Sequence, residues 1–334
     1  MPAKKHKDRS EPNTLKEAIE WFRDEGVAHK YLADRRWPDG NPKCPTCEST
    51  AVLYMPRYRR WKCGTNHPRR QFSVKVGTIM EDSPLKVGTW LAAMWMVANC
   101  KNGVSSYEIH RALDVTQKSA WFMLQRIRLA MQQSQGGGTM GGTIEVDETY
   151  VGGKARNMHK GSERRARQRR GRSREGKAVV MGLLERGTRN NPSRFRAQVV
   201  QNVKRGTLHA IVRENVGEGS AIYSDALRSY RGLEQGYDHR VIDHAVEYVR
   251  GLVHTNGAEN FWSLLKRAVK GTYVSVEPFH LHRYVDEQVF RFNERKDEMG
   301  DRGRFNTLLS YVTGKRLMYR ELIALNEPSA PALA

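Results

Sequence analysis

The sequence lacks a long apolar run. Its most apolar stretch, residues 91–100, is too short to cross a bilayer and contains Asn99. The first nine residues are rich in lysine and have no apolar core, so they do not resemble a secretory signal. These two absences argue against a membrane protein and against a secreted one. We therefore expect a soluble intracellular protein.

Acidic residues are scarce in comparison with basic ones. The chain of 334 residues has 36 Asp and Glu against 57 Lys and Arg, which gives a formal net charge of +21. Such a surplus on a soluble chain indicates a polyanionic partner, usually nucleic acid. The alternative is a basic surface that only aids solubility.

Cysteines are few, and four of them in an intracellular chain argue for metal ligation rather than for a disulfide framework. Cys44 and Cys47 form a C-x-x-C element, and Cys63 and His67 follow after two strand-like runs. Zn²⁺ prefers four thiolate or imidazole ligands, and two pairs separated by a short hairpin supply them. We predict a zinc site made of these four residues. The alternative is unrelated thiols in a loop beside a surface histidine.

Two helical patterns precede a glycine-rich segment. Ser105 and Glu108 have the spacing of a capping box and predict the start of the first helix. After a short turn, residues 117–131 predict a second helix, on which Lys118 and Arg126 are polar positions expected to contact DNA. Two helices joined by a tight turn are typical of a helix-turn-helix. An ordinary helical hairpin is the alternative.

After residue 143 the pattern changes to strands. Strand-like runs occupy residues 144–151, 178–184, 195–200, 221–225 and 240–243. Helical patterns occupy residues 208–216, 256–270 and 278–293. Three strands in succession, followed by alternating helices and strands, predict an α/β domain with a mixed sheet and flanking helices, of the ribonuclease H kind.

Acidic residues recur at the ends of these elements. Asp147 lies in the first strand, and Asp225 ends the fourth. Glu259 and Lys266 are seven residues apart, so they share one face of a helix. Three carboxylates gathered at one sheet edge could hold two divalent ions and cut or join phosphodiesters. Singly, each acid is better explained as a strand-end or helix-cap carboxylate.

The segment between the first two strands, residues 160–177, is dense in arginine. The residues expected to neutralise DNA phosphates there are Arg164, Arg165, Arg167, Arg169 and Arg170. The alternative is a solvated loop without a specific role.

The order and spacing of several motifs carry a family resemblance. They are Val-Asp-Glu-Thr-Tyr-Val-Gly-Gly-Lys at 146–154, Tyr-Ser-Asp at 223–225, His-Thr-Asn-Gly-Ala-Glu-Asn at 254–260, and Arg-Tyr-Val-Asp-Glu at 283–287. With these motifs the chain resembles bacterial insertion-sequence transposases of the DDE type that have an N-terminal zinc ribbon and an ISXO-type catalytic domain. The resemblance covers roughly residues 15–295. It implies a ribonuclease H-like fold, Mg²⁺ or Mn²⁺ in the catalytic site, and DNA cleavage and strand transfer.

The resemblance also implies roles for individual residues. Asp147, Asp225 and Glu259 match the three metal-binding acids, and Lys266, with Arg267 beside it, is expected to contact DNA. Some relatives use asparagine at the third position. Asn256 shares a helix face with Glu259 and is therefore a competitor for that role or a neighbour that supports it.

The implied partners are double-stranded DNA, both element ends and target, and a second copy of the chain in a homodimer or higher assembly. The implied location is the bacterial cytoplasm, at the nucleoid. A non-catalytic, domesticated DNA-binding regulator and a ribonuclease H-like nuclease are the alternative functions. The expected organisation is an N-terminal helix at 1–40, a zinc ribbon at 41–82, a helix-turn-helix-like region at 83–134, a linker at 135–143, the catalytic domain at 144–300 and a helical tail at 301–334.

Overall fold

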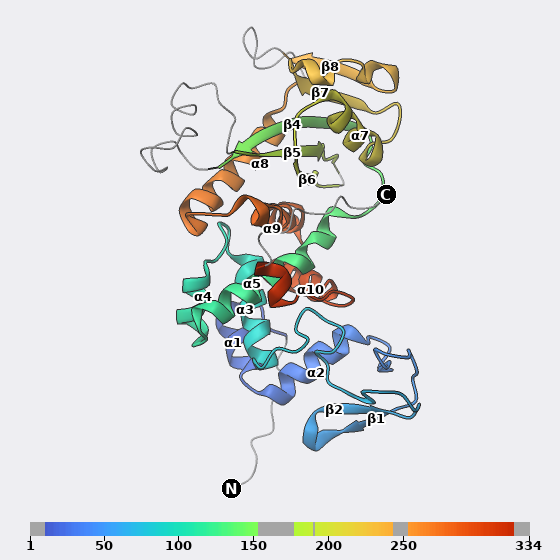
Figure 1. Cartoon of the computed structure of the whole chain (residues 1–334), viewed down its shortest axis with the longest axis vertical. Helices are drawn as coiled ribbons and strands as arrows, with labels where there is room; N and C mark the ends of the chain where they lie inside the picture. The colour runs from blue at the N-terminus through green and yellow to red at the C-terminus, as the bar shows by residue number, and fades with distance from the viewer. Residues whose placement is uncertain (1–10, 153–176, 190, 243–252, 324–334) are drawn as a thin grey trace. The chain divides into compact units, whose positions relative to one another are not determined.

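The computed structural model describes residues 11–152, 177–189, 191–242 and 253–323 (Figure 1). The chain forms two compact units. Unit 1 holds the residues up to Cys100, Val104–Ala130 and the residues from Asp297 onward, and unit 2 holds Lys101–Gly103 and Met131–Lys296. Among the described residues, no helix has the length and apolar character needed to span a membrane.

Unit 1 is built around an apolar helix, α3. Its helices are α1 (Leu15–Phe22), α2 (Glu25–Arg36), α3 (Val87–Asn99), α4 (Ser106–Leu113), α5 (Gln117–Met131), α10 (Asp301–Ser310) and α11 (Tyr319–Ile323). Because α3 is apolar nearly all round, it is buried, and α1, α2 and α10 pack against it. The ring of Phe305 lies 4.9 Å from Trp95 and 5.8 Å from Phe22, so α10 contributes an aromatic side chain to this core.

The predicted zinc ribbon is a small antiparallel sheet in unit 1. Its strands are β1 (Val52–Met55), β2 (Arg60–Cys63) and β3 (Gln71–Phe72), in the order β1-β2-β3. A 3₁₀ turn at Pro56–Tyr58 connects the first two strands. Trp61 packs edge-on against Trp37, with ring centroids 5.0 Å apart, and stacks on Phe72 at 5.9 Å. These aromatic contacts attach the ribbon to the end of α2.

The helical hairpin forms as the sequence predicts. The Ser105 hydroxyl accepts a hydrogen bond from the Glu108 N–H at 3.2 Å, and the Glu108 carboxylate accepts one from the Ser105 N–H at 2.6 Å. This reciprocal pair is the capping box that starts α4. Asp114 ends the helix in a left-handed conformation, and α5 begins three residues later.

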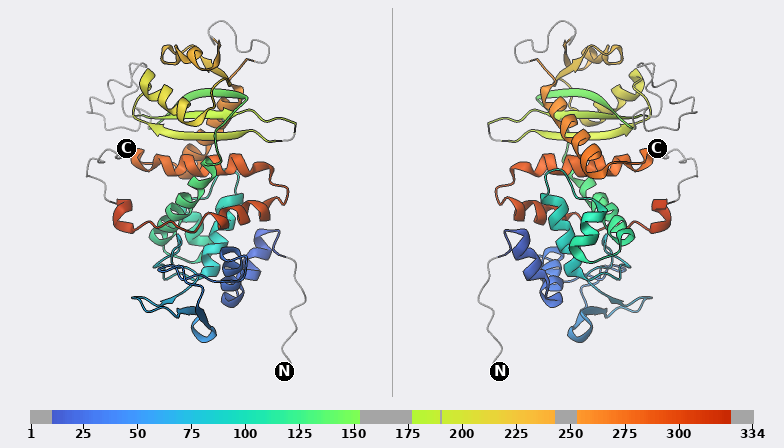
Figure 2. Two further views of the ribbon diagram at one scale, coloured as in Figure 1. Left: turned by 90° about the vertical axis from the view of Figure 1, so that its right-hand side faces the viewer. Right: turned by 90° about the vertical axis from the view of Figure 1, so that its left-hand side faces the viewer.

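Unit 2 is a five-stranded mixed sheet with helices on both faces, so the predicted ribonuclease H-like architecture is confirmed. Its strands are β4 (Thr143–Val151), β5 (Ala178–Glu185), β6 (Arg194–Val200), β7 (Ala221–Asp225) and β8 (Asp238–Ile242), in the order β6-β5-β4-β7-β8. The first three strands are antiparallel, and β7 and β8 run parallel to β4. One face packs on α7 (Arg205–Asn215), and the other packs on α8 (Asn256–Arg267) and α9 (Leu281–Asn293) (Figure 2).

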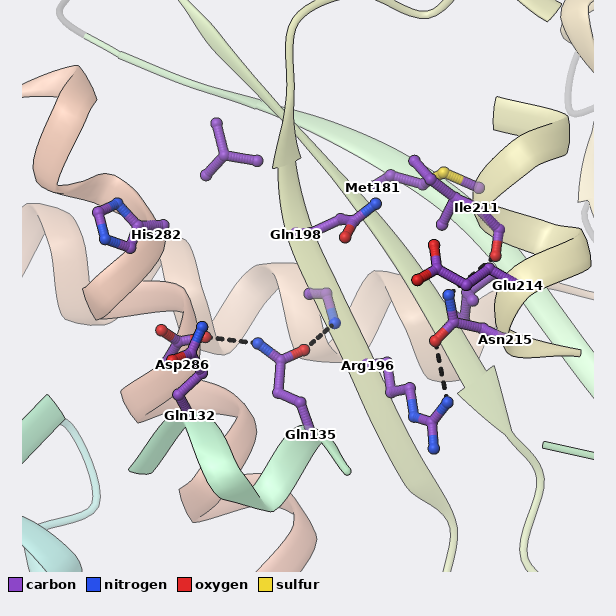
Figure 3. Close-up of a pocket in the computed structure, with 13 residues that line it drawn as sticks. Gln132, Gln135, Met181, Arg196, Gln198, Ile211, Glu214, Asn215, His282 and Asp286 are labelled. Atoms are coloured by element: carbon purple, nitrogen blue, oxygen red, sulfur yellow. Dashed lines mark hydrogen bonds between the residues drawn. The ribbon is translucent and has the colours of Figure 1, made fainter. Parts of the chain in front are cut away.

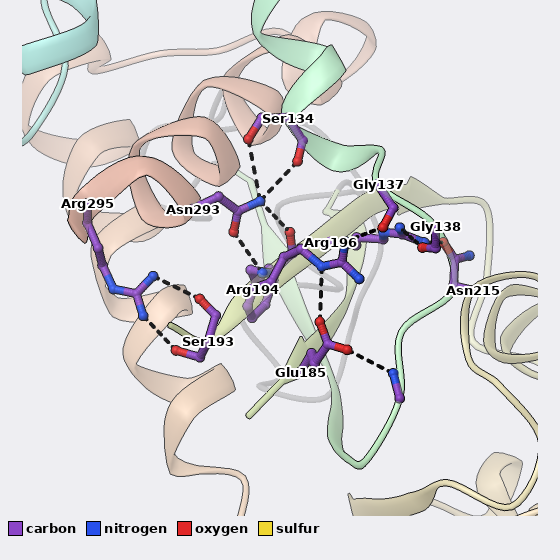
Figure 4. A network of polar contacts seen from close by, with 12 residues as sticks. Ser134, Gly137, Gly138, Glu185, Ser193, Arg194, Arg196, Asn215, Asn293 and Arg295 are labelled. Atoms are coloured by element: carbon purple, nitrogen blue, oxygen red, sulfur yellow. Dashed lines mark hydrogen bonds and ion pairs between the residues drawn. The ribbon is translucent and has the colours of Figure 1, made fainter. Parts of the chain in front are cut away.

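The glycine-rich segment before β4 is hydrogen-bonded to the sheet rather than loosely tethered (Figure 4). The carbonyl oxygens of Gly137 and Gly138 accept hydrogen bonds from Arg194 and Arg196, respectively, both on β6. The Gly141 N–H donates to the Glu185 carboxylate at 2.8 Å. These contacts fix the start of β4, the strand that carries Asp147.

Candidate active site and zinc centre

Two of the three predicted catalytic acids lie side by side on the central strands of unit 2. In the parallel pair of β4 and β7, Val146 is opposite Ser224, so the next residues, Asp147 and Asp225, are neighbours on one face. Parallel strands are about 4.8 Å apart, which places the two carboxylates within reach of a shared cation. Both side chains are half-buried.

The surroundings of Asp147 raise its pKa to about 7. Burial is the main cause, because it penalises the charged form, and the charges of Glu148 and Asp225 act in the same direction. The indole N–H of Trp262 donates to Asp147 Oδ2 at 2.9 Å and opposes the rise. Without a cation, this carboxyl group is therefore about half protonated near neutral pH.

Glu148 faces the other side of the sheet, as the alternation of side chains along a strand predicts. Its carboxylate accepts a hydrogen bond from the hydroxyl of Tyr230 at 2.8 Å. Tyr230 belongs to the core on the α7 side, whereas Asp147 contacts α8. Glu148 is therefore separated from the acidic pair by the strand itself.

Helix α8 carries the remaining catalytic candidates. Glu259 and Lys266 lie three residues before and four residues after Trp262, so all three share the face that approaches Asp147. Lys266 is half-buried. Burial lowers the pKa of Lys266, with a further lowering by the charge of Lys270, while the charge of Asp147 raises it.

Glu259 and its competitor Asn256 are both exposed, in the first turn of α8. Among the residues that the structure describes, Glu259 does not form a tight group of metal-ligating atoms with the two aspartates. The structure thus brings together Asp147, Asp225 and Lys266. It places Glu259 on the matching helix face, one turn from Trp262.

Glu145 is a site residue that the sequence reasoning missed. It lies two residues before Asp147, on the same face of β4, and is 1% exposed. Its carboxylate accepts hydrogen bonds from Arg186 at 2.7 Å and from the Ala258 N–H at 2.9 Å, and the second bond caps the N-terminus of α8. Arg186 in turn donates to the His254 carbonyl oxygen at 2.7 Å. The available signal was a second acidic residue two positions before Asp147, which the alternation of a strand places on the same face.

Two glycines make room for α8 against the sheet. A Cβ on Gly182, which is paired with Asp147, would lie 2.6 Å from both Phe195 and Trp262. A Cβ on Gly257 would lie 2.2 Å from Leu184 and 2.9 Å from the Glu145 carboxylate. Neither position tolerates a side chain without a shift of the helix that carries Trp262.

The four predicted zinc ligands in unit 1 come together. Their ligand atoms all lie within 4.8 Å of one another, with Cys44 Sγ 3.4 Å from His67 Nε2 and Cys47 Sγ 3.6 Å from Cys63 Sγ. A tetrahedron with Zn–S bonds of about 2.3 Å has edges of roughly 3.8 Å, so the spacing suits Zn²⁺. The Nδ1 atom of His67 is 2.7 Å from the Pro68 carbonyl oxygen, a contact that leaves Nε2 for a metal.

The Cys63 thiol is prepared for metal binding. Burial acts to raise its pKa, but hydrogen bonds with His67 and from the Thr65 N–H outweigh burial and lower the pKa to about 6. A thiol with a lowered pKa is largely thiolate at neutral pH, and thiolate is the form that binds Zn²⁺.

The predicted DNA contacts have different environments. Lys118 is exposed in the first turn of α5, and Arg267 is exposed at the end of α8. Arg126 is 5% exposed, and its guanidinium donates to the carbonyl oxygens of Leu317, Ile79 and Glu81 at 2.7–3.1 Å. These three bonds engage the guanidinium within unit 1 and give Arg126 a structural role. The predicted arginines 164–170 lie outside the described residues.

A cavity of about 320 Å³ with a mixed polar and apolar lining lies elsewhere in unit 2, at the edge strand β6 (Figure 3). Its lining includes Gln198 on β6, Glu214 on α7 and His282 on α9. Gln135 also lines the cavity. Its side-chain amide donates a hydrogen bond to the Asp286 carboxylate at 2.5 Å and accepts one from the Ala197 N–H at 2.8 Å, so it covers part of the edge of β6. None of the predicted catalytic residues lines this cavity.

Comparisons with known proteins agree with this arrangement. Residues 139–293 match the family model of the ISXO2-like transposase domain, and residues 23–65 match that of the transposase zinc-ribbon domain. The chain is also similar to an uncharacterized transposase-like protein of Haemophilus influenzae, with 34% identity over 96 residues, 28% of this chain and 77% of that protein.

Proposed function

Because the chain belongs to the insertion-sequence transposases with a zinc ribbon and an ISXO2-like transposase domain, we propose that it binds the ends of its own element and catalyses metal-dependent DNA cleavage and strand transfer. The observation that carries this proposal is the pair Asp147 and Asp225 on neighbouring parallel strands. Two half-buried carboxylates side by side repel each other, and a divalent cation between them removes that repulsion. The donor set fits Mg²⁺ or Mn²⁺, which prefer oxygen ligands.

In this proposal Asp147 and Asp225 hold the metal, and Glu259 completes the site from α8. When bound, divalent ions supply charge stabilisation and activate a water molecule or a DNA 3′-hydroxyl for attack on phosphorus. Lys266 holds a phosphate of the reacting strand beside Asp147 by its charge, and Arg267 contacts the backbone further along. Trp262 orients the Asp147 carboxylate, and Glu145 fixes the start of α8.

We assign the recognition of element ends to the residues that precede the proposed catalytic domain. We propose that the zinc ribbon at 41–82 and the helical region at 83–134 recognise the terminal repeats, with Lys118 at the start of the second helix. The arginines 164–170 neutralise phosphates near the acidic pair, and residues 144–300 carry out the chemistry. The location is the bacterial cytoplasm, where the element's DNA lies. A homodimer or larger assembly is proposed because strand transfer joins two DNA ends at once.

The test is strand transfer in Mg²⁺ with linear DNA that carries the sequences flanking the gene. Asp147→Asn and Asp225→Asn should each reduce the rate at least a thousandfold, because each removes a metal ligand. Glu148→Gln is the matched control, since that side chain faces α7 and glutamine can still accept the Tyr230 hydrogen bond. Near-normal activity in either aspartate variant would remove the proposed mechanism.

A second comparison assigns the third ligand. Glu259→Gln should abolish strand transfer if Glu259 binds metal, whereas Asn256→Ala should reduce it only a few-fold. The reverse result would give the role to Asn256. If the wild-type protein binds element ends without metal and does not nick them, a non-catalytic regulator is favoured. If it cleaves RNA–DNA hybrids in preference to element ends, a ribonuclease H-like nuclease is favoured.

A further inference from the structure

Unit 1 contains a cavity of about 440 Å³ where α2 meets the hairpin of β1 and β2. Aromatic side chains from both elements line it, namely Trp37, Tyr54 and Trp61. The ring centroids of Tyr54 and Trp61 are 5.0 Å apart, and Trp37 is 5.0 Å from Trp61. The two tryptophans are each 8% exposed, but Tyr54 is 44% exposed and presents its ring at the surface.

The polar part of the lining comes from α2. Lys30 and Asp34 form an ion pair at 2.7 Å between two exposed side chains. His29 contacts Glu25 through Nε2 at 3.2 Å, but within the described part of the chain its buried Nδ1 atom has no hydrogen-bond partner. Because this atom is closed off from solvent, α2 offers a ligand the exposed charged groups of Lys30 and Asp34 rather than the ring nitrogen of His29.

The hairpin next to the cavity is strongly basic. Residues 52–62 include Arg57, Arg59, Arg60 and Lys62, all exposed, and no acidic residue. Arg59 is near enough to the cavity for its charge to contribute to a lowered pKa of His29, of which burial is the main cause and which Glu25 opposes. A cationic ligand or a second basic copy of this chain would be repelled here, whereas a polyanion would be attracted.

We propose that this cavity binds an unpaired nucleobase of a DNA strand whose phosphates lie along the basic hairpin. An exposed aromatic ring beside exposed arginines is a combination that holds single-stranded nucleic acid, because every base has a face that can stack on the ring. A base inside a duplex has both faces covered and cannot reach Tyr54. The site would therefore hold a strand that has been opened or has frayed at its end. The inference depends on the proposed function only in the choice of DNA as the polyanion.

The experiment measures binding of the full-length protein, without Mg²⁺, to three probes by fluorescence anisotropy. The probes are a 12-nucleotide single strand of mixed sequence, the same strand with abasic sites throughout, and the corresponding duplex. Wild type should bind the base-bearing strand about 5- to 150-fold more tightly than the abasic strand, the range expected for one base–aromatic stack. Tyr54→Ala should lose this preference and leave duplex binding within about twofold. Tyr54→Phe, which keeps the ring, should retain it.

Leu53→Ala is the matched control, because Leu53 is adjacent on β1, 69% exposed and not part of the lining. Zinc content and near-ultraviolet circular dichroism check that each variant is folded. The proposal is overturned if Tyr54→Ala keeps the preference for bases, or if Leu53→Ala loses it equally. It is also overturned if Tyr54→Ala changes only the sedimentation of the protein, since a second copy would then occupy the cavity. This assay measures binding and not catalysis. A negative result here can therefore be distinguished from a negative result in the strand-transfer test of Asp147.

Discussion

At the scale of single residues, the acidic site depends on the protonation state of the Asp147 carboxyl group. Its pKa of about 7 means that the folded protein without a bound divalent ion holds a proton on Asp147 more tightly than the unfolded chain, where an aspartate titrates near 3.9. The protonated carboxyl therefore favours folding at low pH, and that contribution is lost as pH rises through about 7. A divalent ion needs the carboxylate, so its apparent affinity should fall about tenfold per pH unit below this pKa.

Trp262→Phe tests this account. The substitution removes the indole N–H that stabilises the charged carboxylate, so the pKa of Asp147 should rise further and Mn²⁺ affinity at pH 6 should fall. The titration is read from the ¹³C carboxyl signal of Asp147, assigned by its absence in Asp147→Asn, and the affinity from calorimetry. Trp21→Phe, in unit 1, is the control. A lower pKa in Trp262→Phe would contradict the proposed role of the indole.

The role of a residue could be predicted from the sequence where a local pattern indicates it. It could not be predicted where the role depends on a contact with a residue far away in the chain. Asp147 and Asp225 could be selected from the sequence only as members of an ordered set of motifs, because an acid in or at the end of a strand is common on its own. Arg126 looked like an exposed helical arginine, but its carbonyl partner Leu317 lies 191 positions away. The local sequence does not show why position 182 must be glycine. The reason is steric, because a Cβ there would collide with Trp262, 80 positions further along the chain.

At the scale of elements, the placement of α8 decides whether the acids and Lys266 meet. The helix and its amphipathic pattern could be predicted from the sequence, but its docking could not. That docking depends on the buried Glu145 carboxylate at the helix N-terminus and on Gly257, which lets the first turn approach β5. The predicted Gly-rich linker is a similar case, since its composition suggests flexibility while Arg194 and Arg196 hold its carbonyl groups.

Glu145→Ala should therefore reduce the rate of strand transfer, although Glu145 is not a proposed ligand of metal or DNA. It leaves the Arg186 guanidinium, 20% exposed, without its carboxylate partner and removes the cap of α8. We expect a loss of about 3–5 kcal/mol in the stability of unit 2. Glu145→Gln, which keeps an acceptor for the Ala258 N–H, should lose less. Chemical denaturation measures the stability. A strand-transfer rate per folded molecule that stays at the wild-type value in Glu145→Ala would contradict the positioning role.

At the scale of the whole molecule, the chain returns to its first unit after it has completed the second. A segment that read as a helical tail from the sequence includes α10, which packs on α3, more than 200 positions earlier. Local patterns identify a helix but not its partner, because burial of Phe305 against Trp95 and Phe22 becomes visible only when the fold is known. The integrity of unit 1, to which we assign the binding of element ends, should therefore depend on residues that follow unit 2 in the chain.

Phe305→Ala tests this dependence. Phe305 is 0% exposed, and truncation of a buried phenylalanine costs about 3–5 kcal/mol. That loss should fall on unit 1 and leave unit 2 unchanged, because the contacts of Phe305 with Phe22, Tyr31 and Trp95 are all within unit 1. Hydrogen exchange should then accelerate in α1, α2 and α3 but not in β4, β5 and β7, and specific binding to element ends should weaken. Phe279→Ala is the control, since that ring is 42% exposed and belongs to unit 2. Equal acceleration in both units would mean that the chain unfolds as a single cooperative block, and α10 would then support the whole protein rather than unit 1 alone.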